Sequence, residues 1–275
     1  MKVIFSLTSV ILFSIFGISE IKAGYITMQT QSTVEVRDKS LKVKVAVTNE
    51  GDESAYNVQI YVNENHRIKT SHVKRYLDIK ESFEYESHYD LVQEKQGRYP
   101  LIIGVDYTDA NEYPFTATAV TYYSFGSDTV PKIFGSAGDV KLTGYAKFPL
   151  KLRNMDEVTK EVHIYMITPK ELSVQEKVRE ITLQPQSELT TIFDVNNLSA
   201  LPGSRYQVFF ILEYEDESKH YSSVIPCFIN LDVSNSFFKK YKWYFIVGPS
   251  TLFIVFIVFQ FLLQNSKQSK QGPLN

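Results

Sequence analysis

The segment RYPLIIGVDYTD (98–109) has a counterpart in RYQVFFILEYED (205–216), and both read Arg-Tyr, seven residues, Tyr, one residue, Asp. The two copies begin 107 residues apart (205 − 98), which is about the length of one small β-domain. A repeat of this period is typical of a module that is built twice. The motif therefore predicts two similar domains, and it predicts no particular activity because duplicated β-modules are scaffolds first.

Apolar and polar residues alternate on both sides of each copy with the period of a half-buried strand, as in LKVKVAV (41–47). Helical periodicity is not sustained between the two ends of the chain. About seven short strands in each copy predict an all-β fold of two tandem Ig-like β-sandwiches. Six of them can be placed in each copy: 41–47, 56–62, 77–79, 83–85, 99–107 and 116–125 in the first, and 146–152, 161–165, 181–183, 187–193, 206–214 and 221–230 in the second.

Glycine and proline residues between 126 and 138 would break any strand ladder there. We therefore expect the first sandwich at 24–126, a linker at 127–138 and the second sandwich at 139–236. Because this linker is short, we expect the two sandwiches to lie end to end with limited freedom.

The string VAVTNEGD (45–52), followed by AYNV (55–58), resembles the bacterial Ig-like repeats called cell-adhesion-related (CARDB) domains and the Ig-like module appended to some α-galactosidases. In those families a Val-Thr-Asn-x-Gly turn joins two early strands, and Ala-x-Asn-Val follows. The resemblance covers about residues 32–125 and fades in the second copy, where LRNMD (152–156) keeps only the asparagine. It implies a non-enzymatic spacer, adhesion or accessory module.

The first residues have the pattern of a secretory signal peptide. Lys2 supplies the positive charge, residues 3–18 are apolar, and IKA (21–23) is an acceptable cleavage site. We therefore expect residues 1–23 to be a signal peptide that is removed on export. The alternative is an uncleaved anchor or an ordinary buried segment.

Near the other end, residues 244–263 form a run of 20 without a charge. At about 1.5 Å per residue, such a helix spans about 30 Å, the thickness of a bilayer's hydrocarbon core. Trp243 stands at the edge of this run, where aromatic rings favour the headgroup level. We expect one transmembrane helix at 243–263 and a short cytoplasmic tail at 264–275, whereas a buried soluble helix would need a large core around it.

Lys239, Lys240 and Lys242 precede this helix, and the tail carries two further lysines, so the positive-inside rule supports neither orientation. The signal peptide supports an N-terminus outside, in the periplasm or at the cell surface. The three lysines would then lie beside the membrane, where each contributes about 1 kcal/mol of attraction to anionic headgroups.

The composition argues against nucleic acid as a partner and excludes an intrachain disulfide. With 29 basic and 31 acidic residues, the chain offers no domain-wide basic surface for nucleic acid. Cys227 is the single cysteine, so an intrachain disulfide is excluded, which for an exported Ig-like protein favours a bacterial or archaeal host. We expect Cys227 to be buried as a small hydrophobe; an intermolecular disulfide is the alternative.

The sequence carries no recognisable catalytic or cofactor-binding motif. The five histidines are scattered over both copies, and zinc-ligand spacing, a Gly-x-Ser-x-Gly elbow and a phosphate-binding loop are all missing. We therefore predict that the protein is not an enzyme and needs no cofactor.

The repeated tyrosines have a structural and a functional interpretation. Tyr107 and Tyr214 could each close the corner of a sandwich by binding their hydroxyls to nearby backbone. A ligand site kept in both copies is the alternative.

Acidic residues after two of the expected strands are weak calcium candidates: Asp106, Asp109, Asn111 and Asp216. Calcium requires six to eight oxygen ligands, and neither cluster fits the Asp-x-Asp-x-Asp-Gly loop. Solvated turn carboxylates are the simpler interpretation, and we predict no firm metal site.

One basic stretch, at 66–75, stands only in the first copy and contains Arg67, Lys69, Lys74 and Arg75. It is either a charged edge strand that blocks unwanted pairing or a surface for an anionic partner. These four residues are the best partner-binding candidates in the sequence.

Together these patterns predict a single-pass membrane protein of the cell envelope that displays two Ig-like modules and contacts a protein or an envelope glycan. Two other functions stay open: an accessory subunit of a membrane complex that works through its transmembrane helix, and an envelope hydrolase, which would need a convergent acidic or histidine cluster.

Overall fold

The structure is a computed structural model that describes residues 24–232 and 241–268. The predicted signal peptide, Lys239 and Lys240 lie outside the described residues. The strands are β1 (Met28–Arg37), β2 (Ser40–Asn49), β3 (Ala55–Glu64), β4 (Arg67–Thr70), β5 (Lys74–Leu77), β6 (Ser82–Asp90), β7 (Gln96–Thr108), β8 (Pro114–Phe125), β9 (Ile133–Ser136), β10 (Val140–Leu142), β11 (Tyr145–Asn154), β12 (Lys160–Ile167), β13 (Leu172–Val174), β14 (Val178–Leu183), β15 (Glu188–Asn197), β16 (Arg205–Glu215) and β17 (Lys219–Leu231), and the helix is α3 (Lys242–Gln268).

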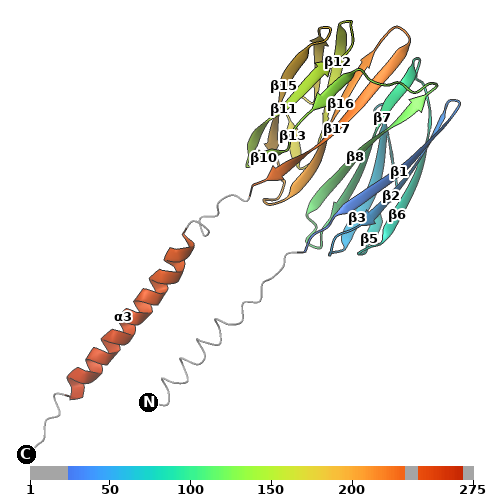
Figure 1. Cartoon of the computed structure of the whole chain (residues 1–275). Helices are drawn as coiled ribbons and strands as arrows, with labels where there is room; N and C mark the ends of the chain where they lie inside the picture. The colour runs from blue at the N-terminus through green and yellow to red at the C-terminus, as the bar shows by residue number, and fades with distance from the viewer. Residues whose placement is uncertain (1–23, 233–240, 269–275) are drawn as a thin grey trace, which may run out of the picture.

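The strands form three sheets (Figure 1). One has the order β1-β2-β6 and another has the order β13-β15-β11-β9. The largest has the order β14-β12-β16-β17-β7-β3-β4, with β5 beside β3, β8 beside β7 and β10 beside β17. The expected β-rich, sandwich-like fold is thus present.

Two separate hydrophobic cores divide the β-structure into an N-terminal lobe and a C-terminal lobe. The core of the N-terminal lobe takes its buried residues from between Leu41 and Tyr123. Strand β2 shows why the chain folds this way, because Leu41, Val43, Val45 and Val47 are buried while the lysines between them face outward. The period-two pattern of the sequence is therefore the two-faced pattern of the sheet.

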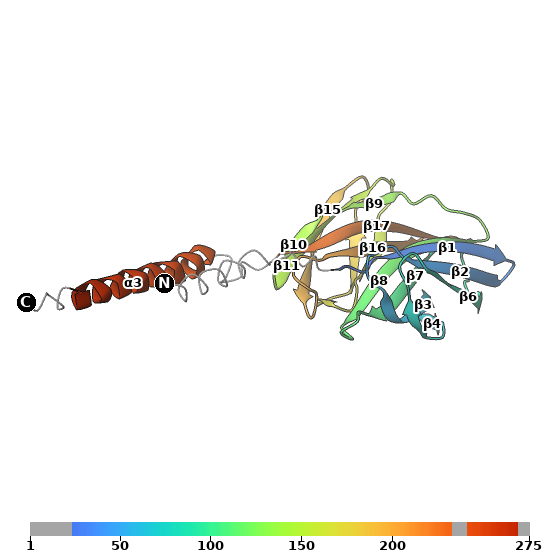
Figure 2. The same cartoon turned by 90° about the horizontal axis from the view of Figure 1, so that it is seen from below.

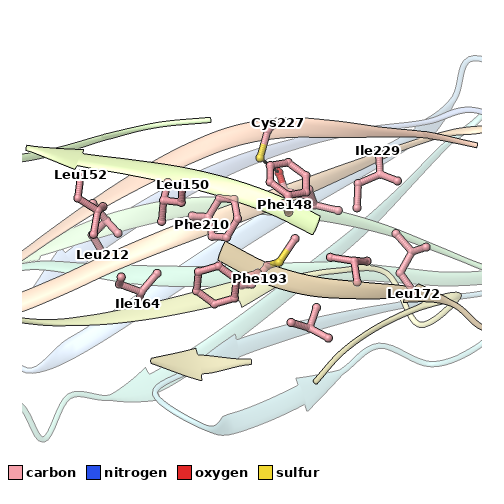
Figure 3. Close-up of a cluster of buried hydrophobic side chains, with 14 of the residues drawn as sticks. Phe148, Leu150, Leu152, Ile164, Leu172, Phe193, Phe210, Leu212, Cys227 and Ile229 are labelled. Atoms are coloured by element: carbon pink, nitrogen blue, oxygen red, sulfur yellow. Dashed lines mark hydrogen bonds between the residues drawn. The ribbon is translucent and has the colours of Figure 1, made fainter. Parts of the chain in front are cut away.

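The core of the C-terminal lobe takes its buried residues from between Ile133 and Leu231. Figure 3 shows its centre, where Phe148, Phe193 and Phe210 pack among leucines and isoleucines. The ring of Phe210 lies 5.3 Å from that of Phe148 and 5.1 Å from that of Phe193, measured between centroids. Cys227 is buried in the same core.

The two lobes lie side by side, and the expectation that they lie end to end is wrong (Figures 1 and 2). Strand β17 of the C-terminal lobe pairs in parallel with β7 of the N-terminal lobe, so one sheet runs through both. Strand β9, inside the stretch expected to be a linker, pairs with β11 and buries Ile133 completely.

Helix α3 is the one described helix, and its window Trp243–Gln260 has a mean hydropathy of 1.8. It is long and apolar enough to cross a membrane, and no part of that window is buried against the rest of the protein. Pro249 lies inside the helix, a position that membrane helices tolerate.

Candidate functional site at the junction of the lobes

The junction begins where the first residues of β7 pair with the first residues of β17. Gly97 is opposite His220 and has a φ of 148°. A Cβ atom on Gly97 would lie 1.9 Å from the His220 carbonyl oxygen, so only glycine allows the two strands to approach this closely. Lys95 binds Glu215 across the same seam, with 2.6 Å between Nζ and Oε2.

The side chain of His220, from the C-terminal lobe, contacts the N-terminal lobe by both stacking and a hydrogen bond. It is buried, and its ring is stacked on that of Tyr99 with 4.1 Å between centroids and 5° between planes. Its Nδ1 lies 2.7 Å from the Arg98 carbonyl oxygen, and because a carbonyl only accepts, Nδ1 carries a proton. Its Nε2 lies 3.3 Å from Oε1 of Glu213.

A buried polar network continues from Tyr99 into the N-terminal lobe. The Tyr99 ring stacks on that of Tyr123, whose hydroxyl donates to Oε1 of Glu64 over 2.6 Å. Glu64 is completely buried, and Arg67 neutralises it. Burial raises the pKa of Tyr99 to about 12, so its hydroxyl stays protonated and donates to the Lys95 carbonyl over 2.7 Å.

A second set of contacts closes the other end of the junction. The backbone N–H of Thr116 in β8 donates to Oε1 of Glu171 over 2.7 Å, and Lys170 binds Asp106 with 2.5 Å between Nζ and Oδ2. Glu171 is 2% exposed, and this burial raises the pKa of its carboxyl. Tyr107 lies near it, and the pKa of that hydroxyl is also raised, by burial first and by Glu171 second.

The second repeat is inverted relative to the first. Strand β7 runs parallel to β17, while the equivalent of β7 in the second repeat is β16, which runs antiparallel to β17. Strand β8 lies against β16, the counterpart of the contact between β17 and β7. His220 and Tyr113 are equivalent by position (220 − 113 = 107), and each contacts the other repeat, Tyr113 through the Ser199 carbonyl.

Two grooves flank this junction, each of about 980 Å³. The His220 groove is lined by Tyr99, Ile102, His163, Tyr165, Glu213 and His220, among others. The Phe115 groove is lined by Tyr107, Phe115, Leu201, Arg205, Tyr206 and Phe228, among others. Both mix aromatic walls with a few polar groups, as non-covalent binding sites do.

Nothing in the described residues brings together a metal centre. Residues 24–232 and 241–268 contain no group of three or more histidine, cysteine, aspartate or glutamate side chains placed to hold an ion. His163 is exposed on β12, where it lines the same groove as His220 and is paired with Glu213 of β16. The groups that line the two grooves are aromatic rings and hydrogen-bonding side chains.

The calcium candidates close hairpin turns. Oδ1 of Asp109 accepts the backbone N–H groups of Asn111 and Tyr113, each over 2.8 Å. Oδ1 of Asp216 likewise accepts the N–H groups of Ser218 and Lys219. Asp106 is engaged by Lys170. Asp109 and Asn111 thus lie in one turn, Asp216 lies in another at the opposite end of the junction, and Asp106 lies within β7.

The basic candidates are placed at the edge of the large sheet, on β4 and β5. Arg67 neutralises the buried Glu64, Lys69 donates to the His88 carbonyl, and Lys74 binds Glu81 over 2.7 Å. Arg75 is exposed. Three of the four therefore bind groups of their own lobe.

The repeated motif has one structural use in both copies. The Arg98 guanidinium lies 4.1 Å from the Tyr122 ring centroid, and that of Arg205 lies 3.6 Å from the Phe228 ring centroid. The geometry is the same in both copies: Tyr122 is paired with Pro100, and Phe228 is paired with Gln207, two positions after the respective arginine. Each guanidinium also pairs with an aspartate, so both arginines are held on the surface of their hairpin.

The two motif tyrosines have different environments. The Tyr214 hydroxyl accepts the backbone N–H of Lys132 over 2.6 Å, as a corner tyrosine would. Tyr107 stacks on Phe115 beside the buried Glu171. In the first copy, the tyrosine that binds nearby backbone is Tyr99, whose hydroxyl donates to the carbonyl of Lys95, four residues before it.

Sequence reasoning missed His220 and Glu171, which join the lobes, and Glu64, which is buried within the N-terminal lobe. Tyr99 was in the motif, but nothing in the sequence indicated its contact with His220. The membrane-side candidates are only partly described: Trp243 is exposed at the start of α3, and nothing is described of the Lys242 side chain. Cys227 is buried, as predicted, and burial raises the pKa of its thiol to about 12.

Comparison with known proteins leaves the family open. No family model matches the chain, and no curated protein matches it. Among solved structures, the chain is similar to the Escherichia coli chaperone DraB, with 13% identity and a TM-score of 0.29 over 37% of this chain and 55% of that one.

It is also similar to an E. coli alpha-2-macroglobulin activated by porcine elastase (7% identity, TM-score 0.30, 78% of this chain and 23% of that one). A third is red sea bream transglutaminase (9% identity, TM-score 0.27, 75% of this chain and 32% of that one). The chain thus spans less than two thirds of each. With TM-scores this low, these likenesses carry no conclusion about this chain.

Proposed function

We propose that this protein is a non-catalytic, membrane-anchored interaction module that holds two Ig-like β-sandwiches outside the cytoplasm and contacts a protein or an envelope glycan there. The observation that carries the proposal is the junction, in which one sheet and buried side chains from both repeats join the lobes into one body. A spacer or a docking module requires a stiff folded part, here the β-structure of residues 24–232, which we call the head, and a short connection to the membrane, here residues 233–240, which we call the tether.

The position of α3 supports the anchoring. Eight residues, 233–240, separate Asp232 at the end of the β-structure from Tyr241 at the start of the apolar helix. Fully extended, they span about 28 Å at most. The head would therefore work close to the membrane, and the His220 groove, with the exposed His163 and Glu161 at its side, is the surface that we assign to the partner.

The proposal is tested by exchanging one part at a time in the full-length protein in its native membrane. One variant replaces residues 243–263 with an unrelated transmembrane span, and a second carries His163→Ala and Tyr165→Ala in the His220 groove. A photo-crosslinker placed at Glu161 reports the partner. We expect the crosslink to survive the exchange of the span and to be lost with the groove variant.

The opposite pattern would overturn this proposal and favour an accessory subunit that works through its helix. A matched control changes two exposed residues outside the groove, Leu189 and Ile192 on β15, and should leave the crosslink in place. Extraction of the protein from membranes by alkaline carbonate would contradict the anchoring itself.

A further inference from the structure

The loop 197–204, here named the exit loop, is fixed at the point where the β-structure ends. The backbone N–H of Gly203 donates to the Leu231 carbonyl over 2.9 Å, and the N–H of Leu231 donates to the Ser204 carbonyl over 2.8 Å. Leu231 is the last residue of β17. The exit loop therefore stands beside the residue from which the chain continues towards α3.

Hydrogen bonds hold the exit loop on both sides. Oδ1 of Asn197 accepts the N–H of Ala200 over 2.7 Å, and its Nδ2 donates to the Ala200 carbonyl over 3.0 Å. The N–H groups of Leu198 and Ser199 both donate to the Glu171 carbonyl. With its backbone bound on both sides, the loop holds Leu198 outward at 66% exposure and Leu201 at 38%.

The chemistry of the exit loop differs from that of its neighbours. Its sequence, NLSALPGS, contains no charge. Tyr145, which is also exposed, lies next to it, because the N–H of Asn197 donates to the Gly144 carbonyl over 2.8 Å. The turns of the N-terminal lobe at the same end are acidic, with Asp52 and Asp109 among their residues.

Single exposed leucines are common on soluble proteins and need no explanation. These two stand apart because an uncharged loop, bound by hydrogen bonds on both sides, presents them beside Leu231, and only the eight residues 233–240 separate the β-structure from the apolar helix. We propose that the exit loop rests on the lipid surface, with Leu198 and Leu201 at the boundary between headgroups and acyl chains. This inference rests on the proposed membrane anchoring, and it identifies a second contact between the head and the bilayer.

Such a contact would fix the orientation of the head. A helix alone leaves the head free to tilt on its tether, whereas a helix and a loop together define a plane. The His220 groove would then face a set direction relative to the membrane, and a partner in the envelope would meet it without a search over tilts.

The test uses the full-length protein in phosphatidylcholine nanodiscs, with an environment-sensitive dye on one introduced cysteine at a time. The variants are Leu198→Cys, Leu201→Cys, Ile254→Cys in α3, and Val130→Cys as the matched control. Val130 is 77% exposed and lies in the segment between β8 and β9, at the opposite end of the junction. The unmodified protein, in which Cys227 is buried, is the labelling blank.

We expect phosphatidylcholine brominated near the headgroup end of its acyl chains to quench the dye at 198 and at 201, and to leave the dye at 130 unquenched. Quenching at 254 but not at 198 or 201 would overturn the exit-loop contact alone. Absence of quenching at 254 by phosphatidylcholine brominated near the methyl end of its acyl chains would overturn the membrane anchoring and the exit-loop contact with it. Equal quenching at 130 and 198 would also contradict the inference, because the contact would then not be directional.

Discussion

The ring of His220, in the second repeat, is stacked 4.1 Å above the ring of Tyr99, in the first. Tyr99 belongs to the repeated motif, and its equivalent in the second copy is Tyr206. The repeated motif thus contributes one of its residues to the contact between the two lobes. This arrangement makes the stability of the junction measurable through single side chains.

Removal of the His220 ring should weaken the junction. His220→Ala loses an aromatic contact of about 1 kcal/mol and a hydrogen bond of about 1 kcal/mol, so we expect a loss of about 2 kcal/mol in the free energy of unfolding. Urea denaturation followed by intrinsic tyrosine fluorescence measures it. His163→Ala, on the exposed face of β12, should leave the midpoint unchanged. Equal midpoints for the two variants would contradict the role of His220.

Gly97 should not tolerate a side chain. In Gly97→Ala the new Cβ would lie 1.9 Å from the His220 carbonyl oxygen, at a φ of 148° that other residues rarely adopt. We expect a loss of about 1–3 kcal/mol from strained backbone and separated strands. Gly138→Ala is the matched control, since nothing lies within 4 Å of its Cβ position. Thermal melts of both variants decide, and a normal melt for Gly97→Ala would refute the close approach.

Glu171 should make the protein less stable as the pH rises. Burial raises the pKa of this carboxyl above its unfolded value. Its contribution to stability is therefore fully present below the unfolded pKa of about 4.3 and is lost as the pH rises through the folded pKa. Glu171→Gln keeps an oxygen for the Thr116 N–H and removes the charge, so we expect it to be more stable than the native protein at pH 7.

The measurement for Glu171 is the unfolding midpoint from pH 4 to pH 7. The difference between Glu171→Gln and the native protein should grow with pH. Glu157→Gln, at an exposed turn, should run parallel to the native protein. A constant difference across the range would show that the carboxyl does not titrate in the folded protein.

Asn49 and Asn154 should be equally intolerant of substitution. Both side chains are completely buried. Nδ2 of Asn49 donates to the carbonyls of Glu53 and Leu77, and Nδ2 of Asn154 donates to those of Val158 and Leu183. Their side-chain oxygens accept the N–H two residues on. Either change to alanine leaves buried backbone groups unpaired, and we expect a loss of about 2–4 kcal/mol in unfolding free energy. Asn111→Ala, in an exposed turn, should change little, and a similarly mild effect at 49 or 154 would count against the buried role.

The thiol of Cys227 should be inert in the folded protein. Burial raises its pKa to about 12, so almost no thiolate forms at pH 8. We expect no reaction with a thiol reagent until denaturant is added, and a monomer on non-reducing electrophoresis. Rapid labelling of the native protein, or a disulfide-linked dimer, would contradict the burial.

The strands that the sequence predicts are those with a strong local pattern. The expected strand at 41–47 lies within β2, and that at 206–214 lies within β16. Strand β1 was missed because most of its residues are exposed and its run MQTQST has no apolar alternation. The short strands β9, β10 and β13 were missed because three or four residues are too few to show a period.

The correspondence between the Asn49 and Asn154 turns was visible in the sequence, because a turn is determined by a few adjacent residues and its asparagine serves the same backbone geometry in both copies. The repeated motif, the β-rich cores and the apolar helix were determined in the same way, by patterns within short stretches. The inverted, side-by-side packing depended on the tertiary structure. His220 and Tyr99 are 121 positions apart (220 − 99), and their contact exists because two sheet edges match in shape at Gly97, which no local pattern encodes.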